Sequence, residues 1–274
     1  MVPRSVTDGR APRLVATDLD GTLLHSDGTV TARTRAVLVE LDALGVPVVF
    51  TTGRPVRWME ELWADVGGHG LAICSNGGIV YDVAERRVRD FSAVPREVGM
   101  ELAEMVRAAV PGTTFAVEHT SGWASEHAFP RHPDDVDTLR QGTWESIWTD
   151  DVVKVLAVHR DLDPEDFWRQ VEAAVGTLVT TTWSSAFALV EMSAAGVTKA
   201  TTLATVAAEM GLGPLDVVAF GDMPNDLPML AWAGTSYAMA NAHASVRDLA
   251  DHLAPANDDD GVAVVLADLF SLSR

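Results

Sequence analysis

The stretch Leu14-Val-Ala-Thr17-Asp18-Leu-Asp20-Gly21-Thr22 decides the fold, because a short apolar run ends abruptly in a polar cluster. This pattern is typical of a buried β-strand that leads into a loop. The same pattern recurs at 46–50, before Thr51-Thr-Gly53-Arg54-Pro55, and at 71–74, before Ser75-Asn-Gly-Gly78. Apolar residues at helical spacing predict helices at 31–44 and 58–66, with Trp58 and Trp63 in the core. Such strand, loop and helix units in a row predict a parallel sheet with right-handed crossovers.

The rhythm of the sequence changes in the middle of the chain. Between 83 and 189 the expected strands follow one another more directly, which favours an antiparallel sheet with helices on one face. The parallel rhythm resumes near Lys199. The fold class that we expect is therefore α/β: a doubly wound, Rossmann-like parallel sheet core, built from 1–82 and 190–274, with an inserted α+β domain at 83–189.

Composition excludes several classes of protein. The 274 residues hold 20 Lys+Arg against 39 Asp+Glu, a formal net charge of −19, which argues against binding nucleic acid through a basic face. No stretch approaches the roughly 18–20 apolar residues that a membrane helix needs, and the polar N-terminus is unlike a signal peptide. Cys74 is the only cysteine, which excludes an internal disulfide, and it is expected to be a buried small apolar residue. We expect a cytoplasmic protein; its oligomeric state is left open.

The chemistry-bearing residues are expected to meet at one edge of the parallel sheet, where ligands bind in such folds. Three carboxylates with no histidine or cysteine nearby favour a hard cation such as Mg²⁺. A lysine and a threonine hydroxyl supply donors for phosphate oxygens, and Gly21 and Gly53 let backbone N–H groups come close. The clusters are Asp18 and Asp20, Thr52, Lys199, and Asp222 with Asn225 and Asp226.

These residue types suit phosphoryl transfer through an aspartyl-phosphate. One carboxylate attacks phosphorus in line, while a second protonates the leaving oxygen and then activates the water that hydrolyses the intermediate. Asp18 and Asp20 fit these two roles, because residues i and i+2 at a strand end project to the same side, roughly 6–7 Å apart.

Four ordered motifs resemble those of the haloacid-dehalogenase-like phosphatases. They are Asp18-Leu-Asp20-Gly21-Thr22, Thr52-Gly53-Arg54, Lys199, and Gly221-Asp222-x-x-Asn225-Asp226. The Ser75–Gly78 loop and an α/β cap of about 100 residues between the second and third motifs are similar to the Cof-like subgroup. The resemblance implies an Mg²⁺-dependent phosphatase whose cap governs specificity, and whose partner is a small phosphorylated metabolite such as a sugar phosphate or a phosphorylated cofactor.

The resemblance also implies a role for each site residue. Asp18 is then the nucleophile and a metal ligand, Asp20 is the acid/base with its backbone carbonyl on the metal, and Asp222 completes the protein ligands. The phosphate-binding residues are Thr52, Gly53, Lys199 and Asn225. Three further residues would support the metal and phosphate ligands from behind or contact the substrate: Asp226, Arg54 and Asn76. Thr51 competes with Thr52, Arg54 could instead pair with a core carboxylate, and Asn76 could simply form a turn.

Other functions stay open on the residues alone. A phosphomutase of the same superfamily would pass the phosphoryl group to product instead of water. A non-hydrolytic receiver-type protein would hold a stable phospho-aspartate, and a glycosyltransferase would use Asp-x-Asp to hold a nucleotide sugar through a metal. In the cap, polar and aromatic residues could shape a substrate pocket or be ordinary packing: His119, Trp123, His127, His132, Trp144 and Trp148.

Overall fold

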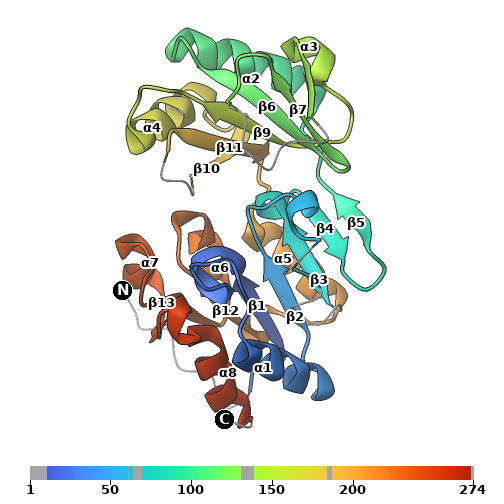
Figure 1. Ribbon diagram of the computed structural model, residues 1–274, viewed down its shortest axis with the longest axis vertical. Coiled ribbons are helices and arrows are strands. Elements are labelled where there is room, and N and C mark those ends of the chain that lie inside the picture. Colours follow the sequence, from blue (N-terminus) through green and yellow to red (C-terminus); the bar gives the residue numbers. More distant parts are fainter. Residues whose placement is uncertain (1–10, 61, 64–69, 131–138, 184–186, 273–274) are drawn as a thin grey trace.

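A computed structural model describes residues 11–60, 62–63, 70–130, 139–183 and 187–272. Within them the strands form two sheets, one of eight strands and one of six. Figure 1 shows each sheet in a lobe of its own, with the two lobes stacked along the long axis of the molecule. No helix in these described ranges is both long enough and apolar enough to cross a bilayer.

The larger sheet is built around β1 (Leu14–Asp18), which is buried along its whole length. It lies between β12 (Val217–Gly221) and β2 (Val48–Thr51), in the order β14-β13-β12-β1-β2-β3-β4-β5. The strands from β14 to β3 run parallel, whereas β4 and β5 extend the sheet antiparallel. The other strands are β3 (Leu71–Cys74), β4 (Ile79–Asp82), β5 (Arg87–Phe91), β13 (Thr235–Met239) and β14 (His252–Ala254). The predicted parallel core is confirmed, with an antiparallel extension that the sequence did not predict.

Helices cover both faces of this sheet. Right-handed crossovers place α1 (Ala32–Ala43) and α8 (Gly261–Phe270) on one face, and α5 (Lys199–Glu209) and α6 (Leu227–Trp232) on the other. The members of each pair are in contact, which agrees with this placement. Thr198 begins α5 as an N-cap that accepts the backbone N–H of Thr201 at 3.1 Å. A further short helix, α7 (Ala244–Leu249), precedes β14.

The smaller sheet has the order β10-β11-β9-β6-β7-β8 and is antiparallel except between β7 and β8. Figure 1 shows α2 and α3 on its outer side, away from the larger sheet. Residues of β9 alternate accordingly: Val155 and Ala157 pack beneath the helices, while Leu156 belongs to the inner face. The elements are β6 (Thr114–His119), β7 (Gly122–Glu126), β8 (Leu139–Gly142), β9 (Val152–Val158), β10 (Val179–Thr182), β11 (Leu189–Ala194), α2 (Arg96–Ala109), α3 (Trp144–Ile147) and α4 (Pro164–Val175).

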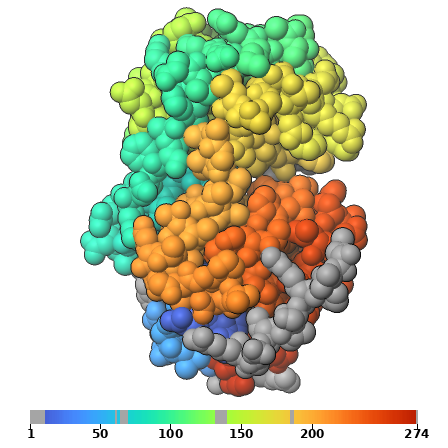
Figure 2. Space-filling view, turned by 180° about the vertical axis from the view of Figure 1, so that it is seen from behind, coloured from blue at the N-terminus to red at the C-terminus, as the bar shows by residue number. Residues whose placement is uncertain are grey.

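The two lobes meet at a waist. Seen from behind, the teal segment that carries β5 lies beside the orange segment that leads into α5 (Figure 2). Sheet membership changes between β5 and α2, and again between β11 and α5. The boundaries expected at 82/83 and 189/190 both precede these changes. The reason is that β5 has little apolar patterning to tie it to one sheet, and β11 pairs with β9 and β10 over its length.

The helix predicted at 58–66 is wrong over its described part. A 3-10 turn, Val56–Trp58, follows Pro55, and Met59 donates its backbone N–H to the carbonyl of Val56 at 3.0 Å. Trp63 is buried as predicted. The prediction of Trp58 as a core residue is wrong, because this residue is 40% exposed and the guanidinium of Arg57 lies 4.9 Å from its ring centroid. The spacing of apolar residues does not distinguish an aromatic side chain at the surface from one in the core. Residues 64–66 lie outside the described ranges.

Candidate active site

Asp18, Lys199 and Asp226 form the buried centre of the site. Asp18 ends β1 and Lys199 begins α5, and the ammonium of Lys199 donates to Asp18 Oδ1 at 2.5 Å and to Asp226 Oδ1 at 2.7 Å. Burial raises the pKa of Asp18 more than the charge of Lys199 lowers it. Burial alone would lower the pKa of Lys199, but the charges of Asp18 and Asp226 raise it. Lys199 is therefore a fixed cation beside the carboxylate of Asp18.

The loop after β12 adds a third carboxylate. Asp226 Oδ2 accepts the backbone N–H groups of Asp222 at 3.0 Å and Met223 at 3.1 Å, which fixes the loop around it. Asp222 Oδ1 accepts the hydroxyl of Thr22 at 3.0 Å. Burial, together with the charge of Asp226, raises the pKa of Asp222 to about 7. Three carboxylates thus share one ammonium, so the cluster has room for further positive charge.

The geometry of this cluster fits a hard divalent cation. Asp18, Asp222 and Asp226 each offer an oxygen, and these oxygens all lie within 4.8 Å of one another. Carboxylate oxygens are the ligands that Mg²⁺ prefers. The side chain of Asp226 belongs to this group, although the sequence predicted it to support the ligands from behind. The carboxylate of Asp20 does not belong to the group.

Gly21 lets the loop after β1 approach Asp222 closely. Its φ is +74°, and a Cβ at this position would lie 2.3 Å from Asp222 Oδ2. Gly28 provides a comparison, because its φ is +81° but a Cβ there would meet no atom within 4 Å. Close approach, as well as backbone conformation, therefore requires glycine at position 21.

We expect Gly21→Ala to lower kcat/KM for an aryl phosphate at least about tenfold, because Asp222 must shift away from the cluster. Gly28→Ala is the matched control, since it introduces the same left-handed strain, about 1–2 kcal/mol, without the contact. Steady-state kinetics and thermal unfolding of both variants check this. Equal losses of activity in the two variants would contradict the role given to the contact.

Asp20 and Arg54 form an ion pair at the rim of the site. Arg54 donates from Nε to Asp20 Oδ2 at 2.8 Å and from a terminal nitrogen to Oδ1 at 2.5 Å. The side chain of Asp20 is 53% exposed, so it is open to a ligand. Of the two interpretations of Arg54, the structure shows the pairing with a core carboxylate.

Thr52 and its neighbour Thr51 point to different surroundings. Thr52 is fully buried and its hydroxyl oxygen accepts the backbone N–H of Arg54 at 3.0 Å, at the turn that ends β2. The hydroxyl of Thr51 instead contacts Met229 Sδ at 3.5 Å. This packing favours Thr52 over Thr51 as the residue on the side of the site.

Asn76 joins the loop after β3 to both lobes. It has the left-handed backbone of a turn former, with φ at +55°, and its side chain is also fully engaged. Its amide donates to Glu191 Oε2 at 2.9 Å and to the hydroxyl of Thr182 at 3.1 Å. Asn225 donates to Asn76 Oδ1 at 3.1 Å. Asn76 and Asn225 therefore lie together beside Lys199, as the sequence predicted for residues of one site.

Three charged residues of the site were missed. Glu118, Lys154 and Glu191 lie on the inner face of the smaller sheet, and each is less than a tenth exposed. Lys154 forms an ion pair with Glu191 Oε1 and donates to the carbonyl of Gly53 at 2.8 Å. Arg57 donates to Glu118 Oε1 at 3.0 Å. The signal was present in the sequence, because each charge interrupts an apolar strand and the chain holds only two lysines, Lys154 and Lys199.

The two lobes enclose a cavity of about 510 Å³ over this centre. Its floor includes Asp18, Asp20 and Asp222 from the larger sheet, and its roof includes Lys154 and Glu191. An adjoining cavity of about 330 Å³ touches Asn76, Lys199 and Asn225, and is lined beyond them by Trp168 and Trp183. Of the predicted site residues, all within the described ranges, Thr52 and Asp226 line neither cavity.

Most of the polar and aromatic residues singled out in the cap are packing. Trp144 and Trp148 are buried under α2, with ring centroids 5.2 Å apart, and Trp123 is buried against Phe129. His119 accepts or donates at 2.6 Å with the hydroxyl of Thr149. His127 is exposed, and His132 lies outside the described residues. Cys74 is fully buried, which confirms that expectation, and burial raises the pKa of its thiol to about 12.

Comparison with known proteins identifies the family. The model of the haloacid dehalogenase-like hydrolases matches residues 15–266. A phosphoglycolate phosphatase of Halorubrum lacusprofundi is 32% identical over 93% of this chain and 96% of its own length. A 5-amino-6-(5-phospho-D-ribitylamino)uracil phosphatase of Bacillus subtilis is 28% identical over 92% of this chain and 93% of its own. The crystal structure of a haloacid dehalogenase-like hydrolase from Bacteroides thetaiotaomicron covers 94% of this chain and all of its own, with a TM-score of 0.77 and 25% identity.

The fold is of the doubly wound α/β class, with an acidic site at the carboxyl edge of its larger sheet. The chain belongs to the haloacid dehalogenase-like hydrolase family. Its predicted enzyme class, phosphoric monoester hydrolase, is confirmed by this membership and by relatives that are named phosphatases.

Proposed function

We propose that this chain is an Mg²⁺-dependent phosphatase that hydrolyses small phosphate monoesters through an aspartyl-phosphate on Asp18. The observation that carries this proposal is the position of Asp18. Its carboxylate lines the floor of the cavity, 2.5 Å from the Lys199 ammonium and within the cluster of three carboxylates. The relatives act on phosphoglycolate and on a phosphorylated ribitylaminouracil, which supports small phosphorylated metabolites as the substrate class.

In the first step, Asp18 attacks phosphorus in line, an Oδ–P bond forms, and the P–O bond to the leaving group breaks. Asp20, exposed at the rim, gives its proton to the leaving oxygen. In the second step Asp20 takes a proton from water, whose oxygen attacks phosphorus and releases Asp18. Mg²⁺ held by Asp18, the backbone carbonyl of Asp20 and Asp222 would offset the repulsion between carboxylate and phosphate. Asp226, which binds Lys199 and the backbone N–H groups of Asp222 and Met223, would hold these residues in place around the ion.

The remaining polar residues position the phosphoryl group. Lys199 stays cationic beside Asp18 and neutralises charge on the transferred oxygens, with Thr52, Gly53 and Asn225 as further donors. Asn76 holds Asn225 in place. Arg54 orients Asp20 between turnovers or meets the substrate. The roles of the motif residues are those of the family, assigned to the residues of this chain that occupy the same motif positions.

The proposed division of labour follows the two lobes: the larger sheet, which includes β5, belongs to the catalytic core, and the smaller sheet, which includes β11, belongs to the cap. Three contacts from the smaller sheet reach loops of the larger one: Lys154 to Gly53, Glu191 to Asn76, and Glu118 to Arg57. Closure of the cap on these contacts would exclude water from the reaction. We propose a cytoplasmic location with neither nucleic acid nor membrane as a partner, which the free, buried Cys74 and the charge of −19 support.

The test is release of inorganic phosphate from a panel of phosphorylated metabolites with Mg²⁺ present, compared by kcat/KM. We expect turnover of p-nitrophenyl phosphate and of at least one metabolite. Transfer of phosphate to a second hydroxyl instead of water would establish the phosphomutase alternative. A stable phospho-Asp18 without turnover would establish the receiver-type alternative.

Asp20→Asn tests the acid/base role. We expect kcat/KM for an alkyl phosphate to fall about 10²–10⁴-fold, because an alkoxide leaves poorly without a proton. The loss should be much smaller for p-nitrophenyl phosphate, whose leaving group needs no proton, since kcat/KM reports the step that expels it. Parallel kinetics with the two esters measure the difference. Equal losses for both esters would rule out Asp20 as the acid.

A further inference from the structure

The inner face of the smaller sheet carries charges where apolar residues would be more stable. Glu118 of β6 and Lys154 of β9 are direct cross-strand partners. Glu191 lies on β11, the strand on the other side of β9. Leu156 and Leu189 are apolar neighbours on this face, while Thr182 is the cross-strand partner of Glu191 on β10. Burying charged groups is costly even when they are paired, and well-packed apolar residues in their place are often more stabilising. The three charges at the roof of the cavity are therefore best explained by what they bind.

The pairing of these groups leaves capacity that faces the cavity. Lys154 carries three N–H donors, and two of them are taken by Glu191 and by the carbonyl of Gly53. A carboxylate oxygen can accept more than one hydrogen bond, so Glu191, which accepts from Lys154 and from Asn76, can also accept from a ligand hydroxyl. All three residues line the cavity above Asp18. The roof thus presents a donor flanked by acceptors on both neighbouring strands.

Charge decides which ligand suits this roof. One ammonium stands against two carboxylates, and the guanidinium of Arg57 brings the group of four to neutrality. A carboxylate on a leaving group would be desolvated beside a group that has no net positive charge to compensate it, with Glu118 and Glu191 next to the ammonium of Lys154. A hydroxyl group accepts from Lys154 and donates to a glutamate, so it meets both kinds of partner.

We propose that Lys154, Glu191 and Glu118 determine specificity by selecting phosphate esters whose leaving group carries several hydroxyls and by rejecting those whose leaving group carries a carboxylate. The inference rests on the proposed phosphatase function and narrows its substrate class. It separates this chain from the phosphoglycolate phosphatase to which it is 32% identical, because glycolate carries a carboxylate. The cavity, about 510 Å³, falls in the size range of sites that hold ligands much larger than a two-carbon acid.

The first test compares wild-type kcat/KM for ribitol phosphate, phosphoglycolate and p-nitrophenyl phosphate with Mg²⁺. We expect ribitol phosphate to exceed phosphoglycolate at least about 100-fold, from two or more hydrogen bonds to charged groups. An equal or greater efficiency with phosphoglycolate overturns this inference while leaving the phosphatase function standing. Failure to hydrolyse any of the three esters overturns the proposed function and this inference with it.

The second test is the double variant Lys154→Met/Glu191→Gln, which leaves no unpaired buried charge and keeps an acceptor for Asn76. We expect the kcat/KM ratio of ribitol phosphate to p-nitrophenyl phosphate to fall about 30-fold or more. An unchanged ratio in a variant with a wild-type unfolding midpoint overturns the inference.

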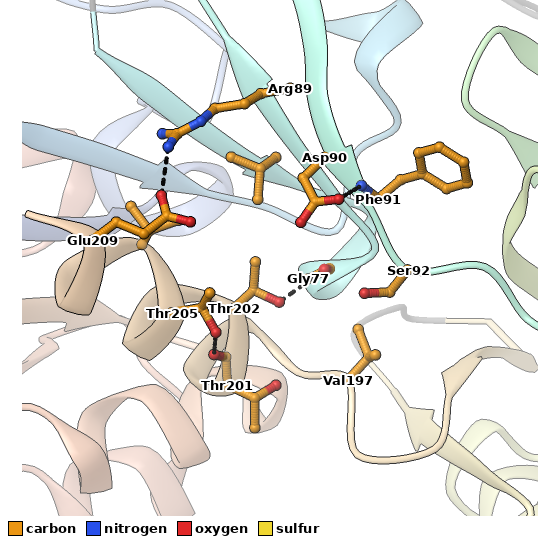
Figure 3. A pocket seen from close by; sticks show the side chains of 12 residues that line it. Gly77, Arg89, Asp90, Phe91, Ser92, Val197, Thr201, Thr202, Thr205 and Glu209 are labelled. Atoms are coloured by element: carbon orange, nitrogen blue, oxygen red, sulfur yellow. Dashed lines mark hydrogen bonds and ion pairs between the residues drawn. The ribbon is translucent and has the colours of Figure 1, made fainter.

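The matched control is Arg89→Met/Glu209→Gln. Figure 3 shows this ion pair, which joins β5 to α5. Its two partners are 2.5 Å apart and line a cavity of about 160 Å³ at the waist. That cavity shares no lining residue with the one above Asp18. We expect the control to keep the wild-type ratio, so that a fall in the first double variant reports leaving-group recognition and not the loss of an ion pair as such.

Discussion

Asp18→Asn is expected to abolish phosphate release, lowering kcat for p-nitrophenyl phosphate at least about 10⁴-fold. The amide has nearly the shape of the carboxylate but is no nucleophile toward phosphorus. The variant should fold, because Lys199 keeps its ion pair with Asp226 at 2.7 Å and so remains a paired buried cation. The measurement is steady-state phosphate release with saturating Mg²⁺, alongside a thermal unfolding curve that verifies the fold.

The control for this variant is Asp161→Asn, an exposed aspartate before α4 that lines neither cavity. It carries the same chemical change and should keep wild-type activity. Substantial turnover by Asp18→Asn would be incompatible with Asp18 as the nucleophile, whatever the activity of the control.

Removal of the divalent metal is the second change with a large expected effect. Asp18, Asp222 and Asp226 surround the phosphate position with negative charge that Lys199 alone cannot balance. We therefore expect chelation with EDTA to reduce kcat at least about 10³-fold, and Mg²⁺ to restore it. Full activity after exhaustive chelation would exclude a divalent metal from the reaction.

Metal binding has a readout that is independent of activity. A ligand bound only by the folded state stabilises it, by about 2.7 kcal/mol at 100 times its dissociation constant. Mg²⁺ should therefore raise the unfolding midpoint of the wild type. Asp222→Asn should lose most of that rise, because it removes a carboxylate from the cluster. An undiminished rise in the variant would place the metal elsewhere.

Much of the core fold could be predicted from the sequence, because its signals are local. The strand β1 begins with the apolar residues Leu14 to Ala16 and ends at the carboxylate of Asp18, and the apolar runs of β2 and β3 likewise lead into polar loops. Parallel strands share one edge for their carboxyl ends, so residues as distant as Asp18 and Lys199 were expected to meet, and they lie in direct contact.

Other features depended on tertiary context that no local pattern carries. The mostly exposed β5 has little apolar patterning to assign it to a sheet, and it pairs with β4 at the edge of the larger sheet, where Val88 packs against the core. Trp58 matched the spacing of a core helix, yet its ring lines the cavity between the lobes. Such residues gain their place from the approach of the cap, which one-dimensional periodicity does not describe.

The cap charges illustrate the same limit at the site. Lys154 and Glu191 are 37 residues apart, and a charge within an apolar strand by itself predicts no partner. Only the antiparallel order β11-β9-β6 brings them together with Glu118 over the catalytic floor. Motif residues on the larger sheet could be predicted because they follow strand ends, whereas residues of the inner sheet face required the topology.

The most direct test of the account is rapid acid quench of the wild type during turnover, followed by mass spectrometry of its peptides. We predict one added phosphoryl group on Asp18, and none on the peptide that contains residue 18 in Asp18→Asn. A phosphoryl group on a different residue, or turnover at the wild-type rate by Asp18→Asn, would contradict it.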